Sequence, residues 1–175
     1  MSSPEQPPYL RIIMLGDDVA TQALNYRFET INRIDQPLNS PTGDVLRSIQ
    51  IGTEGLATEM VIELWNRGGF DMPNILNYYC SQGEAFLVVF NLCRRKSVNA
   101  ITKYTSAIEQ AGRGQCPIAL VGVCKPNQIA VVMEQEAMEL AAQMGLPIFF
   151  VRRRSFEQVM APFVHLSRRR LRQTI

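Results

Sequence analysis

Cysteine and histidine are the residue types best suited to metal binding or nucleophilic catalysis, and their spacing in this sequence favours neither. The four cysteines form no CxxC pair and no pattern with the single histidine, His165, which has no acid or nucleophile pattern around it. Each cysteine lies in or next to an apolar run, which is typical of reduced, buried thiols: Cys80, Cys93, Cys116 and Cys124. We therefore expect no metal site and no catalytic residue. Reduced thiols also indicate that the chain lies in the reducing cytoplasm or nucleus.

Apolar runs alternate with helical patterns along the chain. Runs of apolar residues predict strands over 9–15, 45–51, 60–65, 85–90, 117–122 and 148–151. Apolar residues at helical spacing predict helices over about 21–34, 97–111 and 133–144, and a last helix that opens at the capping box of 155–158. Gly145 is placed to cap the third helix, and Pro162 is expected to kink the last helix or end it early.

This order of elements predicts an α/β fold. The turn-prone residues 52–55 favour an antiparallel hairpin, and the other strands are joined through helical crossovers. We expect a six-stranded, mostly parallel sheet with one antiparallel strand and helices on both faces. A lead-in over 1–8 is expected to be disordered, one domain to cover 9–170, and a basic tail to cover 171–175.

Short segments that carry the predicted strands and the loops after them have a characteristic order. They read RIIMLGD at 11–17, MVIELWN at 60–66, YY at 78–79, FLVVFN at 86–91, SVN at 97–99, IALVG at 118–122, and EAMELA with MGLPIF at 136–149. In order and spacing they resemble the Ras superfamily of small GTPases, and locally its Rab branch. The resemblance covers about residues 10–170 and implies a P-loop NTPase fold of the Ras type.

The phosphate-binding loop that the resemblance implies, GxxxxGK[ST], has lost its chemistry here. Its glycines let backbone N–H groups wrap the phosphates, its lysine neutralises them, and its hydroxyl ligates magnesium. The chain reads Gly16-Asp17-Asp-Val-Ala20-Thr21-Gln22, which is one residue short and has no lysine. Thr21 reaches the magnesium position only if the alignment slides by one, which leaves the phosphate charge unpaired.

The second switch of the family has changed as well. Asn66 stands for the aspartate that reaches magnesium through water, and Phe70 stands for the glutamine that orients the attacking water. Gly69 matches the glycine that meets the γ-phosphate, or is kept as a turn residue. In the first switch, Thr42 is the candidate for the threonine that closes over magnesium.

The base-reading motifs have changed in a different way. Pro126, after Lys125, replaces a carboxylate that accepts two hydrogen bonds from guanine, and Arg152–Arg154, centred on Arg153, stand for Ser-Ala-Lys. Because the losses differ in kind, we expect a pseudo-GTPase that does not hydrolyse GTP and has no cofactor. The alternative is weak guanine-nucleotide binding without efficient hydrolysis, with Thr21 and Gly69 lining a phosphate site and the arginines supplying charge.

A chain without this chemistry is expected to be a protein-interaction scaffold or a constitutive subunit of a larger complex. The resemblance places the effector face on the switches and the hairpin, where the candidates are Arg47, Gln50, Trp65, Phe70, Tyr78 and Tyr79. Aromatic residues and arginine tend to anchor interfaces. For Trp65 and Tyr79, burial in the core is the alternative.

The charge of the sequence is uneven. Residues 152–175 hold seven arginines and one acid, a net +6, against −4 for the remainder. This region favours either contact with an acidic partner, nucleic acid or an anionic membrane, or a solvated helix face. Its candidate contact residues are Arg152, Arg154, Arg168, Arg169 and Arg170. No cysteine follows Cys124, so we expect no prenylation and no stable membrane anchor. Nucleic acid is the disfavoured partner. We expect a cytoplasmic chain that a partner protein recruits to an organelle, cytoskeletal or nuclear complex.

Overall fold

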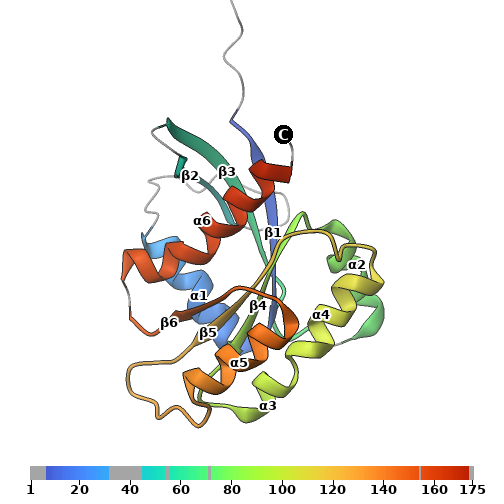
Figure 1. Cartoon of the computed structure of the whole chain (residues 1–175), viewed down its shortest axis with the longest axis vertical. Coiled ribbons are helices and arrows are strands. Elements are labelled where there is room, and N and C mark those ends of the chain that lie inside the picture. Colours follow the sequence, from blue (N-terminus) through green and yellow to red (C-terminus); the bar gives the residue numbers. More distant parts are fainter. Residues whose placement is uncertain (1–6, 32–44, 54–55, 71, 154, 174–175) are drawn as a thin grey trace, which may run out of the picture.

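The computed structural model describes residues 7–31, 45–53, 56–70, 72–153 and 155–173. Its strands are β1 Tyr9–Gly16, β2 Val45–Thr53, β3 Leu56–Asn66, β4 Ala85–Asn91, β5 Ile118–Val123 and β6 Ile148–Val151. Its helices are α1 Asp18–Ile31, α2 Pro73–Gln82, α3 Arg95–Asn99, α4 Ile101–Gln110, α5 Glu134–Met144 and α6 Phe156–Gln173. The elements form three layers, with one sheet between two layers of helices (Figure 1).

The sheet has the order β2-β3-β1-β4-β5-β6. β2 runs antiparallel to β3, and the pairs from β3 to β6 are parallel. The α/β class and the parallel central sheet expected from the sequence are confirmed. Because parallel strands end at the same edge, the carboxyl ends of β1, β3, β4, β5 and β6 meet there, which is where open sheets of this class bind ligands.

Each strand of the central sheet contributes alternate side chains to two apolar cores. Ile12 and Met14 of β1 face a core closed by α1 and α6. Ile13 and Leu15 face a second core, closed by α2, α4 and α5. In Figure 1, α1 and α6 accordingly lie on one side of the sheet and α2, α4 and α5 on the other. Burial on both faces explains why these strands read as continuous apolar runs.

The helices differ from the sequence predictions in three places. The single helix expected over 97–111 is two helices, α3 and α4, which meet at Ala100. α1 begins at Asp18, three residues before the predicted start. α2 had no predicted range, because only Leu76 and Cys80 of its ten residues are buried, and a stripe that narrow gives a weak helical pattern.

Pro162 does not end the last helix, which continues to Gln173 and includes part of the predicted basic tail. Val159, Phe163 and Leu166 on either side of the proline are fully buried. Burial of each such side chain stabilises the helix by about 1.5–3 kcal/mol, which together exceeds the cost of about 3 kcal/mol for a proline inside a helix.

Of the two predicted helix-end signals, the Gly145 cap is confirmed, whereas the capping box at 155–158 forms only in part. Gly145 caps α5 in the left-handed conformation, with φ 66°. Ser155 Oγ accepts the Gln158 N–H at 3.5 Å, but the Gln158 side chain accepts from Arg152 and Arg153 and so does not close a capping box. Residues 1–6 of the predicted lead-in lie outside the described residues. Among the helices described, none is both long and apolar enough to cross a membrane.

Candidate functional site

The connection between β1 and α1 is a tight turn whose polar groups bond to one another. Gly16 has φ 124°, and a Cβ at this position would lie 2.0 Å from the Val89 carbonyl oxygen. Asp17 donates its N–H to that oxygen at 3.0 Å, and its Oδ1 accepts the Ala20 N–H at 2.9 Å. Asp17 therefore N-caps α1 and satisfies an N–H group that would otherwise be open to a ligand.

The second oxygen of the Asp17 carboxylate is also engaged. Arg94, which follows β4, pairs with Oδ2 at 3.0 Å; the Asp17 side chain is only 5% exposed and that of Arg94 is 53% exposed. The N-terminus of a helix attracts negative charge, and here the chain supplies that charge itself. A phosphate at this end of α1 would have to displace the carboxylate and its arginine.

The segment after β3 packs directly onto this turn. Gly69 donates its N–H to the Gly16 carbonyl oxygen at 3.0 Å, and Gly68 donates to Asn66 Oδ1 at 3.2 Å. A Cβ at Gly68 would lie 1.8 Å from Thr21 Oγ1, so only glycine fits beside α1 here. The N–H groups of both glycines are therefore used within the chain.

Thr21 lies at the centre of this contact, close to the segment that contains Gly69. Its side chain is fully buried, and its hydroxyl donates to the Asp18 carbonyl oxygen at 3.0 Å. To bind magnesium, the hydroxyl would have to face an open site. Gln22, one position later, is exposed and donates to Asp18 Oδ1 at 2.9 Å.

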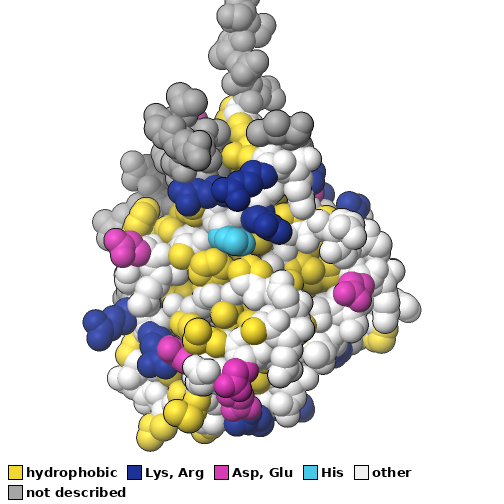
Figure 2. Space-filling model, in the orientation of Figure 1, with side chains coloured by type: hydrophobic (Ala, Val, Ile, Leu, Met, Phe, Trp, Pro, Cys, Tyr) yellow, Lys and Arg dark blue, Asp and Glu magenta, His cyan; other side chains and the backbone are white. Residues whose placement is uncertain are grey.

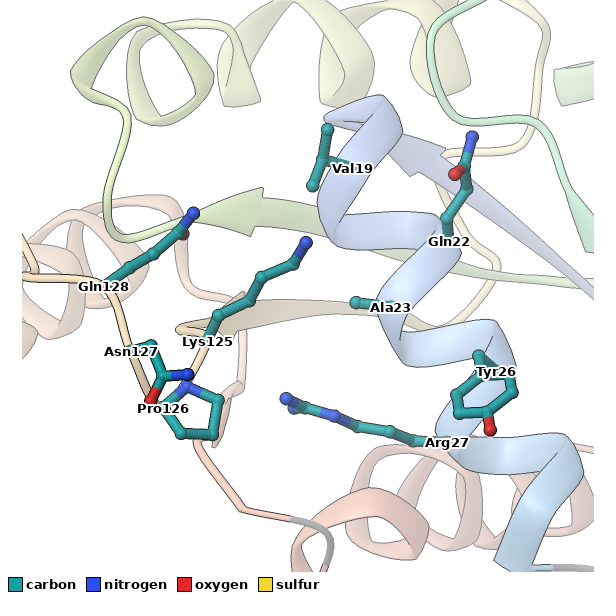
Figure 3. A pocket seen from close by; sticks show the side chains of 9 residues that line it. All are labelled: Val19, Gln22, Ala23, Tyr26, Arg27, Lys125, Pro126, Asn127 and Gln128. Carbon is teal, nitrogen blue, oxygen red and sulfur yellow. The ribbon is translucent and has the colours of Figure 1, made fainter.

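A pocket of about 510 Å³ lies between α1 and the loop after β5 (Figure 3). It is lined on the helix by Val19, Gln22 and Tyr26, and on the loop by Lys125 and Pro126. Lys125 extends from the loop toward α1, and Arg27 extends from α1 toward the loop. Arg27 is buried and donates to the Val151 carbonyl oxygen at 3.2 Å. The described side chains that line the pocket are basic, polar or apolar, and none is a carboxylate.

Of the arginines after β6, Arg152 directs its side chain to another part of the chain, and Arg153 is exposed. Gln158 Oε1 accepts the backbone N–H groups of Arg152 and Arg153 at 3.2 and 3.1 Å. Arg152 Nε pairs with Glu134 of α5 at 2.6 Å, so its charge is directed to that helix. Arg154 lies outside the described residues.

Four aromatic side chains, Trp65, Phe70, Tyr78 and Tyr79, form an aromatic cluster between the end of β3 and α2. Ring centroids lie 6.2 Å apart for Trp65–Tyr79, 5.7 Å for Phe70–Tyr79 and 5.5 Å for Tyr78–Tyr79. The Arg67 guanidinium lies 5.1 Å from the Trp65 ring and 4.7 Å from the Tyr79 ring. These edge-to-face and cation–π contacts stabilise the packing of the cluster.

The cluster exposes only part of its surface. Phe70 is 42% and Tyr78 is 56% exposed, as expected for contact residues, and Tyr79 is half-buried. Trp65 is 7% exposed, so its assignment to the surface is wrong and the core alternative holds. The reason is that β3 is an inner strand and the Arg11 guanidinium covers the indole from β1, at 4.8 Å.

A family model described as "Ras family" matches residues 12–172 of the chain. The chain belongs to the Ras family. A search of the curated proteins gave no match. Domains of the Ras family are normally GTPases, which makes the carboxyl edge of the sheet the place to compare with the family's motifs.

In this Ras-family chain, the fold brings together most of the motif positions expected from the sequence. Gly16, Asp17, Thr21 and Gly69 meet at the N-terminus of α1, while Lys125 lines the neighbouring pocket. Thr42 lies outside the described residues. Arg47 and Gln50 lie on β2, opposite Ile62 and Glu59 of β3, and their side chains are not described.

Two arginines that sequence reasoning missed complete the site of this Ras-family chain. Arg94 pairs with Asp17, and Arg67 covers the aromatic cluster. The only sequence signal for Arg94 is its place just after a predicted strand, at the edge where Gly16 also lies. On α6, Arg168 and Arg169 are exposed, whereas Arg170 is half-buried, with its guanidinium 3.7 Å from Glu84 Oε1.

The cysteines of this Ras-family chain are free thiols. Burial raises the pKa of the Cys80 thiol to about 11, so it stays protonated at neutral pH. Cys93 and Cys124 lie at neighbouring strand ends with their sulfur atoms 3.5 Å apart. Within the described ranges, no three side chains of His, Cys, Asp or Glu come together as metal ligands would.

Proposed function

We propose that this Ras-family chain is a Rab-like pseudo-GTPase that does not hydrolyse GTP and acts as a protein-interaction scaffold or constitutive subunit of a larger complex. One observation carries the proposal: the Asp17 carboxylate caps the N-terminus of α1 and pairs with Arg94. Phosphates of a nucleotide need that helix end free. A carboxylate there repels them and withholds an N–H group.

The groups around Asp17 support the same conclusion. Phosphoryl transfer depends on cations and a metal ion that neutralise the phosphates. The loop has no lysine, the Asn66 side chain is uncharged and accepts an N–H from Gly68, and the Phe70 ring packs against Tyr79. Asn66 lacks the negative charge of the aspartate that it replaces, and the Phe70 ring has no polar atom that could orient a water molecule for attack.

The interaction role rests on the aromatic cluster and Arg67. Tyrosine and arginine are enriched among the residues that dominate binding energy at interfaces. Because ring contacts and cation–π contacts already order these side chains, a partner would lose little conformational freedom on docking. The absence of a nucleotide switch favours constitutive assembly with cytoplasmic partners.

The nucleotide half of the proposal is tested by thermal melting of the purified chain with GTP or GDP and magnesium. A ligand with a micromolar Kd, present at about 100 times its Kd, would stabilise the fold by about 2.7 kcal/mol. This raises the Tm of a chain of this size by about 5–10 °C. We expect a shift below about 1 °C with either nucleotide. A shift of several degrees that requires magnesium would favour the weak-binding alternative and refute the pseudo-GTPase proposal.

The interaction half is tested with two matched tyrosine variants. Tyr78 and Tyr26 are 56% and 58% exposed, but Tyr78 belongs to the aromatic cluster and Tyr26 lies on α1. The tagged chain is captured from its native cells, and its partners are measured by quantitative mass spectrometry. We expect Tyr78→Ala to lower the amount of the main captured partner at least tenfold, because interface anchors contribute about 2 kcal/mol or more. Tyr26→Ala should retain it. Equal capture by both variants would exclude the aromatic cluster as the docking site.

A further inference from the structure

A groove of about 540 Å³ runs along α6 beside β6, on the face opposite the aromatic cluster's layer of helices. We call it the α6 groove. Its apolar part is formed by Phe149 of β6 together with Phe156 and Val164 of α6. Phe156 is 62% exposed, which is a large apolar surface for a side chain that borders a hollow. Exposed apolar side chains that gather around a hollow are one feature of binding grooves.

The other end of the groove is basic. Arg168, Arg169 and Arg172 line it at positions i, i+1 and i+4 of α6. In Figure 2 a row of Lys and Arg side chains lies beside the histidine, with hydrophobic side chains on its other side. The acid that lines the groove, Glu157, lies at the opposite end of the helix, near Phe156. The groove therefore presents an apolar hollow that leads to a positive end.

His165 stands between the two parts. Its ring lies 5.4 Å from the Phe149 ring, at an angle of 58°. Burial lowers the pKa of His165, and the charges of Arg169, Arg172 and Arg168 lower it further. The three arginines among these causes all lie at this end of the groove, where they concentrate positive charge.

We infer that the α6 groove docks an acidic amphipathic peptide segment of a partner protein, with an apolar side chain against Phe149 and Phe156 and carboxylates against Arg169 and Arg172. This inference deepens the proposed interaction role and rests on it. Guanidinium groups pair with carboxylates through two parallel hydrogen bonds, which gives the contact direction as well as charge.

The shape of the groove separates a peptide from other anionic partners. A lipid bilayer presents a broad surface that does not enter a hollow, whereas a peptide side chain does. An oligonucleotide would satisfy the arginines through its phosphates but carries no aliphatic side chain for the apolar part. The combination of an apolar hollow with three arginines at one end therefore fits an acidic peptide with apolar residues best.

The test uses the full chain and a labelled dodecapeptide in which glutamates alternate with leucines, followed by fluorescence anisotropy at low salt. Two control peptides replace all glutamates by glutamines or all leucines by serines. We expect each control peptide to bind at least tenfold more weakly than the parent. The double variant Arg169→Gln with Arg172→Gln and the single variant Phe156→Ala should each weaken binding of the parent peptide at least tenfold.

Matched controls keep the result interpretable. Lys96→Gln removes an exposed charge from α3 and should leave peptide affinity unchanged. Circular dichroism and Tm must match the unsubstituted chain for every variant, which is expected because Phe156, Arg169 and Arg172 are exposed. Chemical-shift changes in NMR should centre on His165 and Phe149.

Three outcomes would overturn the inference. They are equal binding of the parent peptide to the double arginine variant, tighter binding of vesicles rich in phosphatidylserine than of the peptide, and tighter binding of a single-stranded oligonucleotide than of the peptide. Melting with GTP and magnesium in the same preparations tests the proposed function separately. Nucleotide binding together with groove-specific peptide binding would reject the pseudo-GTPase proposal alone, and the reverse pattern would reject the groove alone.

Discussion

Gly16→Ala is expected to lower the free energy of unfolding by about 2–6 kcal/mol, of the roughly 5–15 kcal/mol that a domain has in total. Two effects add. Alanine strains a backbone held at φ 124°, and its Cβ would lie 2.0 Å from the Val89 carbonyl oxygen. The turn must then open, which breaks the bond between that oxygen and the Asp17 N–H.

Urea denaturation followed by circular dichroism measures this change. Gly112→Ala is the matched control, because Gly112 also has a positive φ, 74°, but a Cβ there meets no atom within 4 Å. Gly112→Ala should cost about 1 kcal/mol from backbone strain alone. Equal losses in the two variants would show that the close approach of β1 and β4 is not what requires glycine at position 16.

Phe28→Ala is expected to destabilise the fold by about 3–5 kcal/mol, the usual cost of truncating a buried phenylalanine. Phe28 of α1 and Phe163 of α6 are both fully buried, and their ring centroids lie 4.1 Å apart. They join the two helices over the sheet. Loss of the Phe28 ring would leave a cavity beneath the helix whose N-terminus carries the Asp17 cap.

The control for this experiment is Phe156→Ala, which removes the same ring from an exposed position. It should change the unfolding free energy by no more than about 0.5 kcal/mol. A double-mutant cycle with Phe163→Ala should give a coupling of about 0.5–1.5 kcal/mol between the two rings. Additive losses would mean that the rings contribute through burial and not through contact with each other.

The cap at Asp17 links local structure to the proposed function. In an α-helix the first N–H groups must bond to something, and a ligand or a side chain can serve. In this chain a side chain serves, at 2.9 Å, and an arginine balances its charge. Under the proposed function, the same arrangement that stabilises α1 disfavours a phosphate at this helix end.

Much of the fold follows from the sequence alone. The strands over 85–91 and 118–123 are buried on both faces, so their apolar runs are unbroken and easy to read. Gly145 ends α5 because the left-handed backbone conformation at that position favours glycine. The sequence also determined which chemical groups stand at the motif positions. The loop after β1 has no lysine, and Pro126 stands in the base-reading motif.

The tertiary structure decided which groups those residues meet. Asp17 and Arg94 are 77 positions apart and pair because β1 and β4 are parallel neighbours that end at one edge. Trp65 is buried because Arg11, from the adjacent strand, covers it. Periodicity reports only whether a side chain faces a core, since it depends on local geometry. Contacts between distant residues depend on the order of strands in the sheet, which exists only in the folded chain.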